Sequence, residues 1–387
     1  MIDKNLLVIA PSYTSYVKNQ VEAIASHFNH VYVLVRLNPI AEISKILPIN
    51  YLKPFTKSAK INEINKPENV TVIPTLVYYI PTKMGRQLLY KSHYHSVEKT
   101  LKKYNIKFDL IHAHFTSSSG YVGARLKYNY NKPLIITVHE NRDWLITEYE
   151  SKNKNVIYAW KTADILCRVN SVDIPILKQF NSNVLCIANG FDENHLKQLD
   201  RVECRNKLGL PSDAKIIFSL GLLIERKGYD DLIDAIHRIT LTNRKILCYI
   251  GGHGKIKNKL QNKINKYNLQ DTVKLLGFIE DDLIPIWMNA CDVFVLPSHS
   301  EGNPTVMFES LGCGIPFIGT NVGGIPEIIT SPKYGLVSDP KNVESLAINI
   351  SNGLDCQWDQ SEIHNYAKNF TWKSIGKNYL ILYQSLI

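Results

Sequence analysis

Two glutamates stand eight positions apart in the stretch HSEGNPTVMFESLGCGIP, at Glu301 and Glu309. On one helix they would lie about 12 Å apart along the axis and about 80° apart around it, too far for a close acid–base pair. Gly302 and Pro304 argue against a shared helix, because Pro304 suits the first helical position and leaves Glu301 in the preceding loop. The pattern therefore predicts one acid in a loop and the other inside a helix.

The start of this helix could hold an anion. The N–H groups of Thr305 and Val306 would have no acceptor within the helix, and the helix dipole favours negative charge at this end. The loop acid could then contact a sugar hydroxyl and the helix acid a ribose, so the spacing fits a nucleotide sugar. An ordinary solvated helix start fits the same residues, and spacing alone leaves both readings open.

The elements that would position these residues alternate between strands and helices. Apolar, β-branched runs such as NLLVIA, HVYVLVR and PLIITVHE alternate with helical patterns up to the polar stretch 190–213, after which the alternation restarts at AKIIFSLG. Such runs predict parallel sheets covered by helices on both faces. We expect two doubly wound, Rossmann-like α/β domains facing a cleft, at residues 1–190 and 191–365. A C-terminal helix in residues 366–387 should pack back on the N-terminal domain.

Two segments fit this alternation less well. Residues 41–68 are irregular and rich in Lys and Asn, which predicts an exposed loop. Residues 83–104 carry Leu88, Val97 and Leu101 among basic side chains. This second segment fits a helix lying on a membrane surface, and it fits equally a core-facing helix with a solvated basic side.

Composition places the chain among folded proteins. Of its 387 residues, 45% are hydrophobic and 21% charged, which are globular values. The apolar runs are of strand length, and the first of them is too short for a signal peptide, so we expect a cytoplasmic protein. Seven scattered cysteines form no Cys-x-x-Cys pair, which favours reduced core residues over a metal or redox site.

The positive charge is concentrated in one half of the chain. Residues 1–190 hold 24 Lys and Arg against 13 Asp and Glu, whereas residues 191–387 hold 21 against 22. This asymmetry indicates either an acidic partner for the N-terminal half, such as anionic lipid or a phosphate-bearing substrate, or simply a Lys-rich solvated surface. Nucleic acid is disfavoured as a partner because no recognition motif accompanies the basic residues.

The whole order of motifs resembles one enzyme family. Glu301 and Glu309 form an E-x7-E motif, and PSHSEGNPTVMFESLGCGIPFIGTNVGGIPEII resembles the signature of retaining family 4 glycosyltransferases of GT-B fold. The runs DLIHAHF, PLIITVHE, ADILCRVNS, CIANGFD, ERKG, IGGHG and KLLGFIEDDLIPIWMNACDVFVLPS occur in the family's order, so the resemblance covers nearly the whole chain. The stretch YVKNQVEAI is similar to the subgroup that builds surface polysaccharides or lipid-linked glycans.

The resemblance implies a metal-independent hexosyltransferase that needs no cofactor beyond its UDP- or GDP-linked donor. It implies that Glu301 contacts the donor sugar and that His139 faces the anomeric centre, which makes these two the catalytic candidates. The resemblance implies that the other residues of the donor site supply positive charge, helix N–H groups, a contact to the ribose and a surface for the base. These donor-binding residues are Arg226, Lys227, Phe278, Ile279, Gly302, Asn303, Thr305, Val306 and Glu309.

Three positions depart from the family pattern. Leu222 stands where many relatives have an arginine that clamps a phosphate. The loop 11–16, PSYTSY, replaces a Gly-rich loop, and we expect the hydroxyl groups of residues 13–15 to take its place. Glu140 replaces the glycine that usually follows His139, which puts a carboxylate beside the expected reaction centre.

The function implied by this resemblance is transfer of a sugar, with retention, to a surface-glycan or lipid-linked acceptor. An acceptor of this kind, together with the basic N-terminal half, favours a cytoplasmic enzyme that is located at the inner face of the cell membrane. Two alternatives share the architecture: a nucleotide-sugar epimerase, and a non-catalytic protein that binds a nucleotide sugar and supports a partner transferase.

Overall fold

The computed structural model describes residues 2–45, 50–79, 83–242 and 245–387. The chain forms two compact units, residues 1–188 with 372–387 (unit 1) and residues 189–371 (unit 2). The expected division near residue 190 lies two residues from this boundary. The C-terminal return to unit 1 begins at Trp372, so residues 366–371 stay with unit 2, unlike the expectation.

Unit 1 is built on a seven-stranded sheet in the order β3-β2-β1-β4-β5-β6-β7, with every neighbouring pair parallel. Each strand coincides with an apolar run that the sequence marks as a strand. The strands are β1 (Ile2–Ala10), β2 (Phe28–Leu37), β3 (Val70–Leu76), β4 (Leu110–His114), β5 (Leu134–Val138), β6 (Ile165–Arg168) and β7 (Val184–Cys186).

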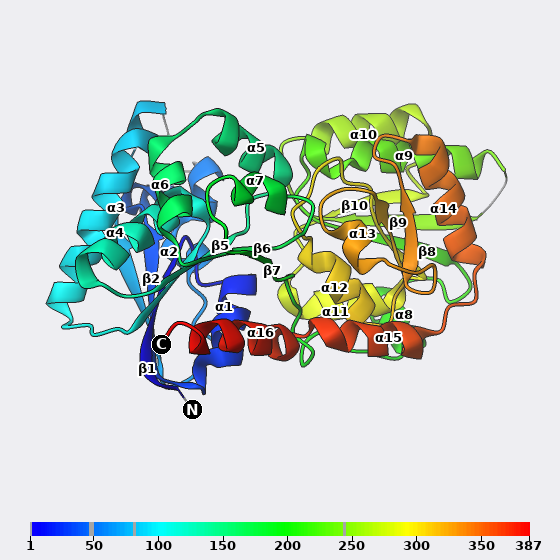
Figure 1. Ribbon diagram of the computed structural model, residues 1–387. Helices are drawn as coiled ribbons and strands as arrows, with labels where there is room; N and C mark the ends of the chain where they lie inside the picture. Colours follow the sequence, from blue (N-terminus) through cyan, green and yellow to red (C-terminus); the bar gives the residue numbers. More distant parts are fainter. Residues whose placement is uncertain (1, 46–49, 80–82, 243–244) are drawn as a thin grey trace. The chain divides into compact units, whose positions relative to one another are not determined.

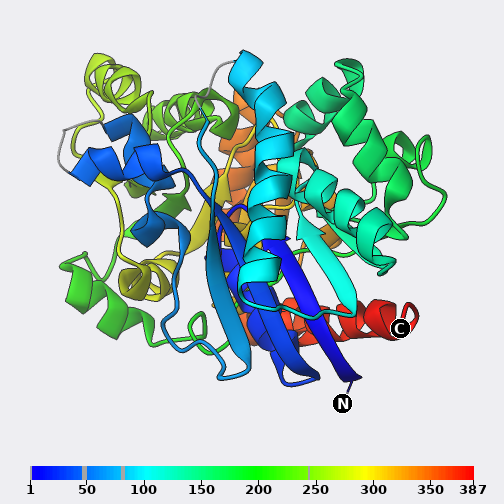
Figure 2. The same cartoon turned by 90° about the vertical axis from the view of Figure 1, so that its left-hand side faces the viewer.

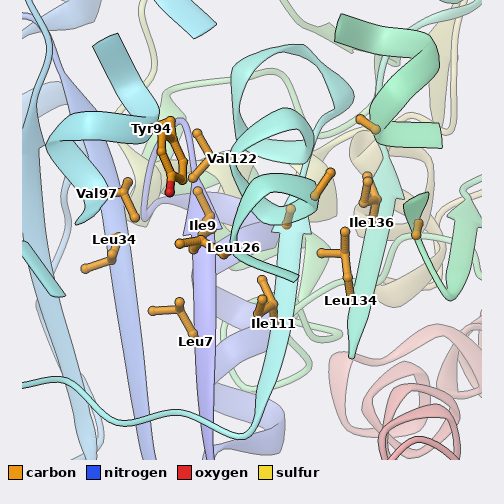
Figure 3. Close-up of a cluster of buried hydrophobic side chains, with 14 of the residues drawn as sticks. Leu7, Ile9, Leu34, Tyr94, Val97, Ile111, Val122, Leu126, Leu134 and Ile136 are labelled. Carbon is orange, nitrogen blue, oxygen red and sulfur yellow. The ribbon is translucent and has the colours of Figure 1, made fainter. Parts of the chain in front are cut away.

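Helices cover both faces of this sheet. Alternate residues of β1 enter different cores: Leu7 and Ile9 join the cluster under α3, α4 and α6, whereas Leu6 and Val8 join the cluster under α1 and α16. Figure 3 shows the first cluster, with strand side chains meeting Tyr94 of α3, and Figure 2 shows α3 lying across that face. The helices are α1 (Ser15–Ala25), α2 (Lys57–Lys60), α3 (Lys83–Lys103), α4 (Tyr121–Tyr130), α5 (Arg142–Glu150), α6 (Lys154–Thr162), α7 (Ile174–Lys178) and α16 (Trp372–Gln384).

The C-terminal helix α16 packs on α1, as expected for the end of the chain (Figure 1). Gly376 permits the close approach, because a Cβ there would meet Ile24 at 3.3 Å and Ala23 at 3.4 Å. The buried Tyr379 and Tyr383 reach through this layer to the sheet.

The segment 41–68 is not the exposed loop that its composition suggests. It contains the 3-10 helices η1 (Pro39–Lys45) and η2 (Asn50–Phe55), then α2, and it buries Ala41 and Lys60. Residues 46–49 of the segment lie outside the described part. A bridge between Tyr13 and Ile61 ties it to the first loop of the sheet.

Unit 2 repeats the architecture with a six-stranded sheet in the order β10-β9-β8-β11-β12-β13. The expectation of two doubly wound parallel units is therefore confirmed. The strands are β8 (Lys215–Leu220), β9 (Ile246–Gly251), β10 (Val273–Gly277), β11 (Val293–Leu296), β12 (Phe317–Thr320) and β13 (Gly335–Ser338). The helices are α8 (Arg201–Leu208), α9 (Tyr229–Thr240), α10 (Lys257–Lys266), α11 (Ile284–Ala290), α12 (Thr305–Gly312), α13 (Ile325–Ile328), α14 (Val343–Asp355) and α15 (Gln360–Ala367).

Candidate active site

Three charged side chains meet at the carboxyl ends of the neighbouring strands β8 and β11. Glu301 follows β11, and its Oε1 accepts hydrogen bonds from Lys227 Nζ at 2.5 Å and from the Ser298 hydroxyl at 2.6 Å. Its Oε2 lies 3.3 Å from Nη1 of Arg226. Lys227 and Glu301 are only 9% and 4% exposed. The structure thus brings together the two predicted cations and the predicted loop acid.

The two loops that carry these charges are joined through their backbones. His299 donates its N–H to the carbonyl of Arg226 at 2.7 Å, and Arg226 Nη1 donates to the carbonyl of Ser300 at 2.9 Å. Gly228 ends the 3-10 turn η4 (Glu225–Lys227) with φ +69°, a left-handed conformation that glycine adopts readily. A Cβ at Gly228 would fall 1.9 Å from the Pro297 carbonyl oxygen, so glycine is required for this approach.

The second acid of the motif lies on α12. This helix starts at Thr305, and Pro304 is its N-cap with extended backbone, so the expected place of Pro304 at the first helical position was wrong by one residue. Thr305 and Val306 occupy the first turn, where an α-helix has no internal acceptor for their N–H groups. The pKa of Glu309 is raised to about 7: burial raises it most, a hydrogen bond with Thr305 lowers it, and the negative charge of Asp281 raises it by a smaller amount. Glu309 is therefore an acid that changes charge near neutral pH.

The loop between the two glutamates is held from both sides. Asn303 Oδ1 accepts from the Asn189 N–H at 3.1 Å, and the Asn303 carbonyl accepts from Asn189 Nδ2 at 2.8 Å. The Gly302 carbonyl accepts from the Gly324 N–H at 2.8 Å. Asn303 Nδ2 is buried with no hydrogen-bond partner among the described residues, which leaves this amide group to donate to a ligand.

Phe278 and Ile279, the predicted base platform, have different environments. Phe278 is 64% exposed, with its ring centroid 6.2 Å from that of His253. Ile279 is only 7% exposed and packs against Gly251, where a Cβ would meet it at 2.4 Å. Phe278 therefore has an aromatic ring accessible from solvent, whereas Ile279 packs into the interior of unit 2.

His139 lies in unit 1, directly after β5. Its Nε2 is 3.0 Å from Nδ1 of His114, and the two rings stack with centroids 5.2 Å apart. Burial, and then the electrostatic influence of the His114 ring and of the Arg168 guanidinium, hold the pKa of His139 well below its usual range. His139 is therefore neutral, and its buried Nδ1 has no protein partner in the described structure.

Two departures from the family pattern have structural roles. The Glu140 carboxylate is buried and accepts from the Thr116 N–H at 2.7 Å, so it holds the turn after β4. Tyr13 is fully buried, and its hydroxyl lies 3.3 Å from Glu22. The expectation that the Tyr13 hydroxyl replaces a ligand-binding loop was therefore wrong. Leu222 is 49% exposed beside the cation site.

Ser298 is a functional candidate that sequence reasoning missed. Its hydroxyl is fully buried and holds the same Glu301 oxygen as Lys227. Its position two residues after β11 and three residues before the acid is the one signal that could have indicated it.

Comparison with known proteins gives the same class for both units. The model for Glycosyltransferase Family 4 matches residues 16–172, and the model for Glycosyl transferases group 1 matches residues 200–370. A Bacillus subtilis glycosyltransferase provisionally assigned to teichuronic acid biosynthesis is 29% identical over 259 residues. The alignment covers 65% of this chain and 63% of that protein, less than two thirds of its length.

Two solved structures extend the comparison to the full chain. Sucrose-phosphate synthase of Thermosynechococcus elongatus has a TM-score of 0.76 at 20% identity, covering 99% of both chains. Anabaena HepE, solved with UDP-glucose, has a TM-score of 0.74 at 20% identity, covering 99% of this chain and 100% of its own. The two family models together with the fold thus define a glycosyltransferase of GT-B fold. The chain belongs to the family 4 glycosyltransferases, as the sequence motifs predict.

Proposed function

We propose that this chain transfers a hexose, with retention, from a UDP- or GDP-linked sugar to a surface-glycan or lipid-linked acceptor. The observation that carries the proposal is the cluster of half-buried Arg226 with buried Lys227 and Glu301, in which Glu301 precedes the start of α12 by four residues. Two cations and a helix N-terminus suit a diphosphate, and the glutamate suits sugar hydroxyls. The structural neighbour Anabaena HepE, solved with UDP and with UDP-glucose, supports the same donor class.

The proposed chemistry is direct displacement on the face that the diphosphate leaves. As the glycosidic bond breaks, negative charge grows on the departing phosphate, and Lys227 and Arg226 stabilise it. The departing phosphate takes the proton of the acceptor hydroxyl. The neutral His139 imidazole contacts the donor sugar as a hydrogen-bonding group and carries no charge of its own. These cations perform the role that a divalent metal serves in other transferases, so we propose a metal-independent enzyme.

Release of nucleoside diphosphate tests this proposal. Purified protein should release UDP or GDP from one donor only when a glycan acceptor is present, and Glu301→Gln should reduce the rate by at least tenfold. Turnover of the donor without acceptor would point to an epimerase or hydrolase. Binding without any turnover would point to a non-catalytic partner, and wild-type rates for Glu301→Gln would contradict the assigned role.

Peripheral contact with an anionic membrane is proposed for the basic side of α3. Val97 and Leu101 of α3 enter the core, so this is a core-facing helix, while Lys91 and Lys99 are exposed on its other side. No helix in the described ranges is long and apolar enough to cross a membrane. Co-sedimentation with phosphatidylglycerol vesicles that is lost in 0.5 M salt would support this contact, which we place at the inner face of the membrane.

A further inference from the structure

Unit 1 contains a second group of buried cations that the proposed donor chemistry does not use. Arg36 lies near the end of β2 and donates from Nη1 to the Ser118 hydroxyl. Lys60, at the end of α2, is 8% exposed and donates to the Arg36 carbonyl at 3.3 Å. His93 of α3 is fully buried, and its Nδ1 lies 3.1 Å from the same Ser118 hydroxyl. Two of these basic side chains, Arg36 and His93, therefore contact one serine hydroxyl, and the third, Lys60, contacts the backbone of Arg36.

Within the described part of the chain, these cations lack an acidic partner. Among the residues whose side chains the structure describes, neither Arg36 nor Lys60 has a carboxylate partner. The Arg36 Nε and the His93 Nε2 are buried with no hydrogen-bond partner. Unpaired buried charge and unsatisfied buried donors destabilise a fold, so they mark places where a ligand supplies the missing partner.

Two buried acids of unit 1, Glu140 and Glu148, each hold another group through one carboxylate oxygen, and neither is among the described partners of Arg36 or Lys60. Glu140 holds the Thr116 N–H at 2.7 Å, and Glu148 accepts from the Trp144 indole at 3.1 Å. The aromatic contacts of the cations are weak substitutes for an anion: the Arg36 guanidinium lies 5.7 Å from the ring centroid of Tyr79.

The protonation of the cluster reflects this lack of a counter-charge. Burial, and then the charge of Arg36, lower the pKa of Lys60 to about 7. Burial, and then the charges of Arg36 and Lys60, hold the pKa of His93 well below its usual range. An anion placed among the three groups would reverse both effects.

The cluster lies at the same edge of the unit 1 sheet as His139, the residue proposed to contact the donor sugar. Ser118 belongs to the turn η3 (Thr116–Gly120) that follows β4, while His139 follows β5. Arg36 lies near the end of β2 in the same parallel sheet, so all three lie toward the carboxyl edge of unit 1. Ser118 adopts φ +59°, a conformation that a non-glycine residue rarely takes, and this turn places its hydroxyl between Arg36 and His93.

We infer that Arg36, Lys60, His93 and Ser118 bind a phosphate group carried by the sugar acceptor. This inference rests on the proposed glycosyl transfer and specifies its acceptor as an anionic, phosphate-bearing molecule. Guanidinium, ammonium and imidazole donors, together with a serine hydroxyl, match the several acceptor oxygens of a phosphate monoester or diester. The phosphate belongs either to a soluble sugar phosphate or to a polyprenyl-phosphate carrier, and both present the same group to the site.

Binding of defined phosphates separates these sources. Glucose 6-phosphate and farnesyl phosphate in detergent micelles are titrated into the full chain by calorimetry, with glucose and farnesol as uncharged controls. At least one phosphate should bind, and Arg36→Gln and Lys60→Met should each weaken it about tenfold or more. Lys107→Gln removes an exposed positive charge from the same unit and should leave the affinity unchanged. Preference for glucose 6-phosphate indicates a soluble acceptor, and preference for farnesyl phosphate a lipid-linked one.

Lys227→Met distinguishes this site from the donor site. If a phosphate binds in unit 1, its affinity is retained in Lys227→Met and lost in Arg36→Gln. The reverse pattern, or equal affinity in wild type and both unit 1 variants, would overturn the inference, as would failure of both phosphates to bind. Unfolding midpoints of each variant show whether a loss reflects misfolding. A chain that binds no nucleoside diphosphate yet keeps Arg36-dependent phosphate binding would refute the proposed function alone.

Discussion

The ammonium of Lys227 lies 2.5 Å from Oε1 of Glu301, and both side chains are almost fully buried. The cation proposed for the diphosphate and the acid proposed for the sugar are therefore positioned by one another. Replacing either one changes the environment of the other.

Lys227→Met should reduce kcat by about 10²–10³-fold, because it removes a charge that stabilises the departing phosphate. It should also destabilise the chain by about 3 kcal/mol, since Glu301 stays buried with fewer partners. Steady-state kinetics and chemical denaturation measure the two effects. Lys259→Met is the matched control, because Lys259 is 53% exposed in its ion pairs with Glu225 and Asp230. Similar kcat values for both variants would contradict the assignment of Lys227.

Glu309 should make nucleotide affinity depend on pH. Its pKa of about 7 means that the carboxylate is mostly protonated at pH 6 and mostly ionised at pH 8. Only the ionised form accepts hydrogen bonds from both ribose hydroxyls, so the preferred nucleoside diphosphate should bind about tenfold tighter at pH 8. Glu309→Gln should lose this dependence, while any titration of the nucleotide itself appears in both proteins. An identical pH profile for the two proteins would contradict the ribose contact.

The same carboxyl should affect stability with the opposite sign. Its pKa is raised in the folded state, so between about pH 4.5 and 7 the folded chain binds more protons than the unfolded chain at this site. The free energy of unfolding of wild type relative to Glu309→Gln should therefore fall as the pH rises through this window. Denaturation curves at pH 5 and pH 7.5 measure this difference, and a rise would show that burial does not raise the pKa.

Two glycines with similar backbone conformations should respond differently to alanine. Gly209 has φ +63° with nothing within 4 Å of an added Cβ, so Gly209→Ala should cost about 1 kcal/mol from backbone strain alone. Gly228 has φ +69°, and its Cβ would overlap the Pro297 carbonyl, so Gly228→Ala should cost several-fold more. Gly228→Ala should also lower activity, because it separates the loops that carry Lys227 and Glu301. Equal unfolding free energies for the two variants would contradict this account of the turn.

His114 should support His139 without touching the nucleotide. His114→Phe keeps a ring for stacking but removes the hydrogen bond to His139 Nε2, so kcat should fall about tenfold with nucleotide affinity unchanged. Tyr383→Phe, which removes a hydrogen bond to the neighbouring His112, is the control; it should cost about 1 kcal/mol of stability and leave kcat intact. Unchanged kcat in His114→Phe would exclude this supporting role.

Much of the fold could be predicted from sequence because buried parallel strands are continuous apolar runs. β13 was missed, since its four residues, Gly335–Ser338, form no such run. The family motifs assigned Lys227 and Glu301 to one donor site, and the structure pairs them. Ser298 was missed because a single serine outside these assignments carries little information. The burial of Tyr13 could not be foreseen, since it depends on Ile61, 48 positions away, which lies in a segment whose composition suggests an exposed loop.

The central claim is that unit 2 binds a nucleoside diphosphate sugar through Lys227, Glu301 and Glu309. Thermal unfolding of the chain with UDP-, GDP-, ADP- and dTDP-sugars tests it most directly, because a ligand that binds the folded state raises the midpoint. We predict that one nucleotide class raises the midpoint of wild type and raises it much less in Lys227→Met and Glu309→Gln. No shift with any donor, or the same shift in wild type and both variants, would contradict the claim.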